Sequence, residues 1–223
     1  MHVTKASIHG NPNVGLYGFC TEKYVLVGPE VPKDMHKTYE EIFQKPVKVL
    51  TIAGTSLLGV FLNGNKKCLL VPNIAYDYEL EALDKLEIEY QVIESRLTCL
   101  GNNILTNDKY ALLSPEYKEE DEKSIGEALG VPTKRRKLVD VNTVGSIAIM
   151  NDKGCLIHHE ASKQDIDLIS TNFAISVEHG SVNMGNPYVK SGILLNDHGF
   201  VMGDTSGGPE IVHADRVFGF LEQ

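Results

Sequence analysis

Short apolar runs separated by polar turns recur along the whole chain. The clearest case is VGSIAIMNDKGCLIHH at positions 144–159, where two apolar runs flank Asn151-Asp152-Lys153-Gly154. Asn, Asp and Gly tolerate the positive φ that tight turns need, so this segment is predicted to form a β-hairpin. The same pattern occurs at positions 14–29, 57–72, 100–115 and 189–204.

The hairpin segments repeat with a nearly fixed period. Pro29, Pro72 and Pro115 are spaced by 43 residues, and the turn residues Asn107 and Asn151 by 44. A period of roughly 20–50 residues is typical of a repeat architecture. We therefore expect one domain over residues 1–223, with repeats at approximately 10–52, 53–96, 97–140, 141–184 and 185–223.

A helical pattern follows each hairpin. In the first repeat Tyr39, Ile42 and Phe43 form one apolar stripe, which can cover a sheet. Ser114-Pro115-Glu116 predicts a helix start in the third repeat, and Ser162 with Asp165 predicts a capping box in the fourth. A β-branched run follows each of the first four helices, so the predicted unit is hairpin, helix and third strand.

The first strand of the chain stands apart from this order. Val3–Ile8 followed by His9-Gly10 aligns with Val47–Ile52 followed by Ala53-Gly54 at an offset of 44. We therefore expect residues 3–8 to supply the missing third strand of the fifth repeat. Such a pairing closes the repeats into a ring and removes exposed sheet edges.

Composition narrows the range of functions. The formal net charge of −9 argues against a broad, non-specific nucleic-acid binder, which needs a cationic surface. No apolar run approaches the roughly 18 residues of a membrane span, and the N-terminus lacks an apolar signal-peptide core. The four cysteines form no CxxC pair, so we expect a reduced, cytoplasmic setting and no membrane partner.

Glycines recur at one repeat position: Gly15, Gly59, Gly101 and Gly145, with Gly192 near the fifth. A small residue where strands approach one axis explains them better than a phosphate cradle. A Walker A loop needs Gly-Lys-Ser/Thr, which the segment at 54–60 lacks. No cofactor and no small-molecule substrate are expected.

The cysteines are candidate catalytic nucleophiles, because five-fold α/β propellers include guanidine-modifying enzymes with a catalytic cysteine. Cys68 and Cys155 share one repeat position with Ala111 and Phe200, which is not expected of a nucleophile. Structural cysteines are therefore favoured. His158-His159 diverge on a strand and have no second cluster with ligand spacing, so no metal site is expected.

Polar residues at the five hairpin turns are the main candidate site. In a ring all five turns lie at one end and make a broad polar face, which suits a macromolecule better than a small substrate. Turn chemistry alone is the competing explanation. The residues expected to bind a partner are Asn65, Lys66, Asn107, Asp108, Asn151, Asp152, Asn196 and Asp197. A second candidate is the basic cluster Lys134–Lys137, for which a solvated loop is favoured and a secondary RNA contact is the alternative.

Several motifs, in order along almost the whole chain, resemble a known family. They are Gly10-Asn11-Pro12-Asn13-Val14-Gly15, Gly64-Asn65 with Leu69-Leu70-Val71-Pro72, Leu100-Gly101-Asn102, Asn107-Asp108 with Tyr110-Ala111-Leu112, Val144-Gly145-Ser146 and Gly180-Ser181-Val182-Asn183. This set resembles translation initiation factor six, the ribosome anti-association factor of archaea and eukaryotes. The chain ends at Gln223 without the longer extension of eukaryotic members, so the archaeal form is expected. Lys190 departs from the family's Val-Gly-Ser-Gly pattern, which affects one local loop.

The resemblance implies a fold and a function. The fold would be a pentein, an α/β propeller of five pseudo-symmetric repeats of about 44 residues closed into a ring. The function would be binding to the large ribosomal subunit, which blocks premature joining of the small subunit, with a role in subunit maturation. We expect a monomer that contacts mainly ribosomal protein and is not an enzyme. A guanidine hydrolase or amidinotransferase of the same fold is the alternative.

Overall fold

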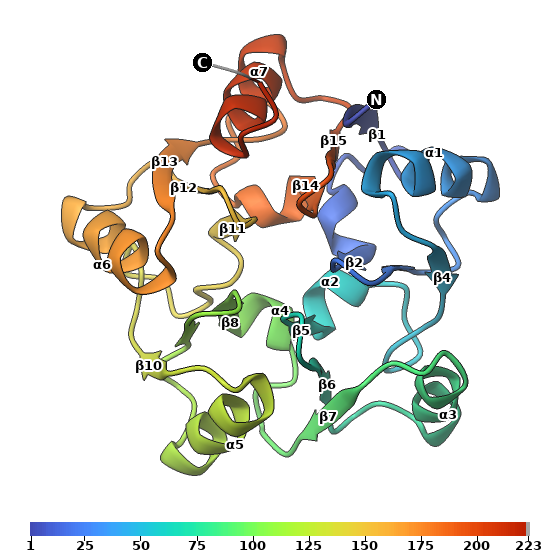
Figure 1. The fold of residues 1–223 in the computed structure, drawn as a ribbon, viewed down its shortest axis with the longest axis vertical. Helices are drawn as coiled ribbons and strands as arrows, with labels where there is room; N and C mark the ends of the chain where they lie inside the picture. Colours follow the sequence, from blue (N-terminus) through green and yellow to red (C-terminus); the bar gives the residue numbers. More distant parts are fainter. Residues whose placement is uncertain (222–223) are drawn as a thin grey trace.

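Five three-stranded sheets surround a central axis in the computed structural model, which describes residues 1–221 (Figure 1). The predicted ring of five α/β units is confirmed. The repeat boundaries stay a prediction, and positions 222 and 223 of the fifth repeat lie outside the described residues.

Each sheet combines a hairpin with a third, outer strand. The inner strands, which line the axis, are β2 (Gly18–Cys20), β5 (Asn63–Gly64), β8 (Ile104–Thr106), β11 (Ala148–Met150) and β14 (Ile193–Leu195). The middle strands pair antiparallel with them and are β3 (Val25–Val27), β6 (Leu69–Pro72), β9 (Ala111–Leu113), β12 (Gly154–His158) and β15 (Phe200–Gly203). All middle-strand residues are buried, which explains their continuous apolar runs.

The outer strands run parallel to the middle strands and follow the helices. They are β4 (Val47–Val49), β7 (Tyr90–Ile93), β10 (Thr133–Arg135), β13 (Ser176–Gly180) and, from the N-terminus, β1 (Val3–Ala6). The helices on the outside of the ring are α1 (Lys33–Phe43), α3 (Asp77–Lys85), α5 (Glu119–Leu129), α6 (Lys163–Phe173) and α7 (Gly208–Val217) (Figure 1). Each one returns from the far end of its sheet to the end that carries the hairpin turns.

The two predicted helix starts have different outcomes. Ser162 caps α6, because its Oγ accepts the Asp165 amide at 3.2 Å and the Asp165 carboxylate accepts the Ser162 amide at 3.1 Å. The predicted start at Ser114 is wrong, because α5 begins at Glu119. The intervening turn is held by Tyr117, which is 2% exposed and anchors the segment in the core before the helix begins.

Short helical turns precede the inner strands and were not predicted, because one turn is too short to show periodicity. They are η1 (Val14–Leu16), α2 (Leu58–Phe61), α4 (Leu100–Asn103) and η2 (Val189–Gly192). They pack around the axis so closely that a Cβ on Gly59 would collide with the Gly15 carbonyl oxygen, and one on Gly101 with that of Gly59. Gly15, Gly59, Gly101 and Gly145 thus form a ring around the axis, called here the glycine collar. Its fifth member is Lys190 and not Gly192, since a Cβ on Gly15 would meet the Lys190 carbonyl oxygen.

The N-terminal strand closes the ring. β1 pairs in parallel with β15 from Val3↔Phe200 to Ala6↔Gly203, which completes the fifth sheet. The residue before this strand also contacts the last helix, because His2 Nε2 lies 2.9 Å from Asp215 Oδ1 of α7. The apolar core lies between units as well as within them: Ala6 of β1 and Val201 of β15 pack in one cluster with Tyr39 of α1.

Candidate functional site

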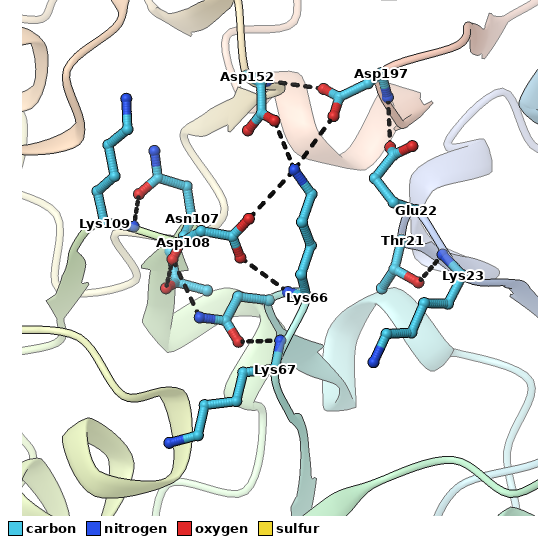
Figure 2. A network of polar contacts seen from close by, with 12 residues as sticks. Thr21, Glu22, Lys23, Lys66, Lys67, Asn107, Asp108, Lys109, Asp152 and Asp197 are labelled. Atoms are coloured by element: carbon cyan, nitrogen blue, oxygen red, sulfur yellow. Dashed lines mark hydrogen bonds and ion pairs between the residues drawn. The ribbon is translucent and has the colours of Figure 1, made fainter.

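The five hairpin turns converge at one end of the axis (Figure 2). They surround a shallow depression of about 100 Å³ and are called here the tip face. The tip face consists of Thr21-Glu22-Lys23, Asn65-Lys66-Lys67, Asn107-Asp108-Lys109, Asn151-Asp152-Lys153 and Asn196-Asp197-His198. The eight sequence-predicted residues are therefore brought together in one place.

The asparagine side chains build the turns. Asn151 is representative: its Oδ1 accepts the amides of Lys153 and Gly154, each at 3.0 Å, which closes an Asx turn. Asn65, Asn107 and Asn196 make the same pair of hydrogen bonds. In the first unit the hydroxyl of Thr21 takes over this role.

The same asparagines join each turn to the helix of the next unit. Asn107 Nδ2 donates to the Phe173 carbonyl at the end of α6, at 3.0 Å, and Asn151 Nδ2 donates to Phe218 just after α7, at 3.0 Å. Asn65 reaches Leu129 of α5 at 3.0 Å and Asn196 reaches Phe43 of α1 at 2.9 Å. Because both Oδ1 and Nδ2 of each side chain are hydrogen-bonded, the asparagines form the rigid frame of the tip face. Their contact with a partner stays a prediction.

The residue after each asparagine, together with Glu22 after Thr21, points to the centre, and these five residues form an inner ring: Glu22, Lys66, Asp108, Asp152 and Asp197 (Figure 2). Three backbone amides of this ring donate to the carboxylate of the next unit: Lys66 to Asp108 at 2.9 Å, Asp152 to Asp197 at 2.9 Å and Asp197 to Glu22 at 2.8 Å. The ring holds four carboxylates and one lysine. The sequence prediction included Lys66, Asp108, Asp152 and Asp197 but not Glu22. It also could not include these hydrogen bonds between units, because they depend on distances that only the closed ring sets.

In the second unit Lys66 stands where the other four units have Asp or Glu, and its positive charge neutralises part of the negative charge of the inner ring (Figure 2). Its Nζ lies 2.6 Å from Asp152, 3.3 Å from Asp108 and 3.7 Å from Asp197. The hydrogen bond to Asp152 is the main reason that the pKa of Lys66 is raised, so the ammonium stays charged at any physiological pH.

The two carboxylates beside Lys66 respond differently to the ring. Burial alone would raise the pKa of Asp152, but its hydrogen bond with the Lys66 ammonium lowers it below the usual value. Burial and the neighbouring charges of Asp152 and Glu22 raise the pKa of Asp197. The centre of the tip face is thus anionic overall, with one cation held in its middle.

An outer set of lysines lies at the ends of the helices. Lys67, Lys109 and Lys153 place Nζ near the carbonyls of Glu127, Ala174 and Gly219, at 3.1, 3.5 and 3.1 Å. Helix C-termini attract cations because their last carbonyls are unpaired. The tip face therefore has an acidic centre and a basic margin.

A second cavity of about 130 Å³ lies along the axis behind the tip face. Apolar side chains such as Phe19, Ile149 and Leu194 and the polar Asn63 line it. Lys190 enters it from the glycine collar and donates to the Gly101 carbonyl, so it bridges across the axis. Burial lowers the pKa of Lys190 to about 8.

The other predicted features lie away from the tip face. In the basic cluster Arg135 pairs with Glu122 at 2.6 Å and Arg136 with Asp165 at 3.3 Å, which leaves Lys134 and Lys137 facing solvent. All four cysteines are free thiols. Burial raises the pKa of Cys155 to about 12, the reverse of what activates a nucleophile.

Metal sites and membrane-spanning helices are both absent from residues 1–221. Those residues contain no group of three His, Cys, Asp or Glu side chains able to hold a metal ion. None of the helices in this part of the chain is long and apolar enough to cross a membrane.

Comparison with a solved structure supports the fold alone. A dimethylarginine dimethylaminohydrolase has a TM-score of 0.54 with this chain at 12% identity, and the match covers 83% of this chain and 78% of that one. The predicted pentein fold is thereby confirmed.

Comparison with protein sequences identifies the family. The model of the eIF-6 family matches residues 3–217. Translation initiation factor 6 of Thermococcus onnurineus is 33% identical over 228 residues, with 100% of both chains covered. The factor of the same name from Saccharolobus islandicus is 33% identical over 222 residues, covering 98% of this chain and 100% of the relative. These are the names of a translation factor from archaea and not of an enzyme. The chain therefore belongs to the eIF-6 family, and its role is that of a translation factor.

Proposed function

We propose that this protein binds the large ribosomal subunit through its tip face and thereby prevents premature association with the small subunit. Membership of the eIF-6 family supports a role in translation. The large ribosomal subunit as the partner, and steric blocking of the small subunit as the mechanism, go beyond this family membership and are what we propose. A part in large-subunit maturation, a monomeric state and a cytoplasmic location belong to the same proposal.

The observation that carries the proposal is the convergence of all five turns into one rigid polar platform. Its central depression of about 100 Å³ is smaller than the roughly 300–1,000 Å³ of typical small-molecule sites. The asparagine frame holds the platform in place, so little ordering is needed when a partner docks. A flat, preformed surface of this kind favours a macromolecular partner.

The charge pattern favours ribosomal protein over rRNA at the centre of the interface. Four carboxylates against Lys66 repel phosphate groups but accept basic or neutral protein side chains. Contact with rRNA, on this proposal, is confined to basic residues at the margin or to Lys134 and Lys137.

The test is co-sedimentation of variants with purified archaeal large subunits across a salt series. Asp152→Lys reverses an exposed charge at the centre of the tip face, and we expect it to weaken binding at least roughly tenfold, or about 1.4 kcal/mol. Glu81→Lys is the matched control, because Glu81 is exposed on α3 away from the tip face. Subunit joining, followed by light scattering, should resume with Asp152→Lys but not with Glu81→Lys.

A different surface would be indicated if the tip variants bound normally. In particular, the assignment is wrong if reversing Lys134 and Lys137 abolishes binding while Asp152→Lys has no effect. Incubation with arginine tests the alternative function of a guanidine-modifying enzyme. We expect neither citrulline nor ornithine, since burial raises the pKa of the Cys20, Cys68 and Cys155 thiols, the reverse of what activates a nucleophile.

A further inference from the structure

A turn at the end of β4 binds a carboxylate of the next unit. Ala53 and Gly54 adopt left-handed φ values of 53° and 70°, which turns both amides in the same direction. Glu79 of α3 accepts the Ala53 amide at 2.7 Å, the Gly54 amide at 2.9 Å and the Thr51 hydroxyl at 2.6 Å. One carboxylate oxygen takes the hydroxyl and the glycine amide, and the other takes the amide of Ala53.

The turn at the end of β13 repeats this arrangement in another unit. Glu210 of α7 accepts the Ser181 hydroxyl at 2.7 Å, the Met184 amide at 3.2 Å and the Gly185 amide at 2.9 Å. The division between the two carboxylate oxygens is the same as for Glu79. Two independent examples in one molecule thus define a receptor made of one hydroxyl and two amides, with a carboxylate as its ligand.

The turn after β1 presents the same three donors without a ligand. Ser7, His9 and Gly10 align with Thr51, Ala53 and Gly54 at the offset of 44. His9 and Gly10 have φ values of 50° and 80°, and the bridge Ile8↔Asn11 matches the bridge Ile52↔Thr55. Within residues 1–221 none of the three donors forms a hydrogen bond.

The ligand is missing because the helix that follows differs at one position. Glu79 and Glu210 are the third residues of α3 and α7, and the third residue of α1 is Met35. Met35 packs against the apolar core instead. Pro32, which precedes α1, has no amide to be capped, so this helix does not require a carboxylate of its own. The turn after β1 is close to α1, because Ile8 packs in one apolar cluster with Met35 and Tyr39 of that helix; β1 and α1 are neighbours in Figure 1.

We propose that Ser7, His9 and Gly10 form a receptor for a carboxylate supplied from outside the chain. The site is open, because His9 and Gly10 are exposed and a Cβ on Gly10 would meet no atom within 4 Å. It lies at the end of the ring opposite the tip face, so it is independent of the function proposed above. A planar carboxylate matches the two-oxygen pattern of both occupied receptors, whereas phosphate would need further donors.

Amide chemical shifts of the isotope-labelled full chain test the receptor directly. Titration with acetate should shift the His9 and Gly10 amides saturably. The Ala53 and Gly54 amides, already bonded to Glu79, should not move and serve as an internal control. Ser7→Ala should weaken acetate binding by roughly tenfold, since it removes a donor to a charged group. A peptide with one glutamate that binds more tightly than acetate would identify a protein side chain as the source; equal binding would identify a small carboxylate.

A second variant keeps the test decisive. Met35→Glu should fill the receptor from within, moving the His9 and Gly10 amides toward the positions of Ala53 and Gly54, raising Tm and abolishing the response to acetate. Met35→Gln is the matched control and should leave that response in place. The proposal is overturned if the two amides ignore acetate, if chloride or inorganic phosphate shifts them more strongly, or if folded Met35→Glu leaves them unchanged.

Discussion

Glu79 shows how a single buried charge can hold two units together. Its side chain belongs to a residue that is 1% exposed, and it accepts hydrogen bonds from Thr51, Ala53, Gly54 and Tyr76. Burial alone would raise its pKa, but these hydrogen bonds lower it below the usual value of 4.5. The carboxylate therefore stays ionised and replaces water for three backbone amides that would otherwise be unpaired.

Glu79→Gln should lower the free energy of unfolding at pH 7 by about 1.5–3 kcal/mol, because the hydrogen bonds lose their charged acceptor. Since the folded pKa lies below the unfolded one, the stabilisation by Glu79 is complete above about pH 4.5 and is lost as pH falls through the folded value. Urea unfolding from pH 7 to pH 3 measures this. The variant should lose less stability over that range than the parent, and equal losses would show that Glu79 is not a source of the acid sensitivity.

Lys190 is predicted to give a pH dependence of the same direction as Glu79, but in the alkaline range. Burial lowers its pKa from 10.5 to about 8, so between these values the unfolded chain binds more protons than the folded one. Stability from this group should therefore rise as pH increases from about 8 to 10.5. Lys190→Met should remove that rise, whereas the exposed control Lys123→Met should keep it. Urea unfolding at pH 7.5, 9 and 10 compares the three proteins, and parallel curves for all of them would refute a charge buried at Lys190.

At the scale of elements, four of the five hairpins are each joined to the helix of the next unit by one asparagine. Asn151 is 7% exposed and holds its own turn through Lys153 and Gly154 while reaching Phe218 beyond α7. The motif explains why asparagine recurs at four of the five turns. It also separates the two roles of the tip face, since the asparagine frames the surface and the next residue is exposed on it.

Asn151→Ala should cost about 2–3 kcal/mol of stability, because it leaves the Gly154 amide and the Phe218 carbonyl without partners in a buried place. Hydrogen exchange should accelerate at Lys153 and Gly154 and at the end of α7. The adjacent variant Asp152→Lys should change stability little, because Asp152 is exposed, yet it should lose subunit binding. If both variants lose stability and subunit binding to the same extent, the asparagines and the residues that follow them do not have separate roles.

The sequence predicted most of these elements because they repeat. Five polar hairpin turns, four of them with Asn, and five apolar helix stripes were sufficient for the ring, and β1 was found from its offset alone. The one-turn helices η1 and α2 were missed, since they are shorter than any helical period. The start of α5 was misplaced because Tyr117 anchors a turn, a tertiary contact that local capping signals do not contain. Which polar residues frame the tip face and which are exposed on it depends on distances between units, so no local pattern reveals it.

At the scale of the whole molecule, the ring depends on a strand contributed from the other end of the chain. Without β1, the buried strand β15 becomes an edge, and its residues Phe200–Gly203 are apolar. Ile8, which is 1% exposed, would also leave the core. An exposed apolar edge pairs readily with other chains, so ring closure protects against aggregation as well as unfolding.

Deleting residues 1–8 should therefore cost at least about 4 kcal/mol from lost strand hydrogen bonds and apolar burial, a fall in Tm of roughly 8–16 °C. The control is a circular permutant that joins the two ends by a short linker and opens the exposed loop between Asn73 and Ile74. A linker from the end of α7 to β1 has a short distance to span, because His2 contacts Asp215 of α7. Calorimetry and light scattering compare the three proteins. The permutant retains β1 and should stay monomeric with a Tm close to that of the parent, whereas the truncated chain should aggregate. A truncated chain that melts with the parent as a monomer would show that the other four sheets hold the ring without its closing strand.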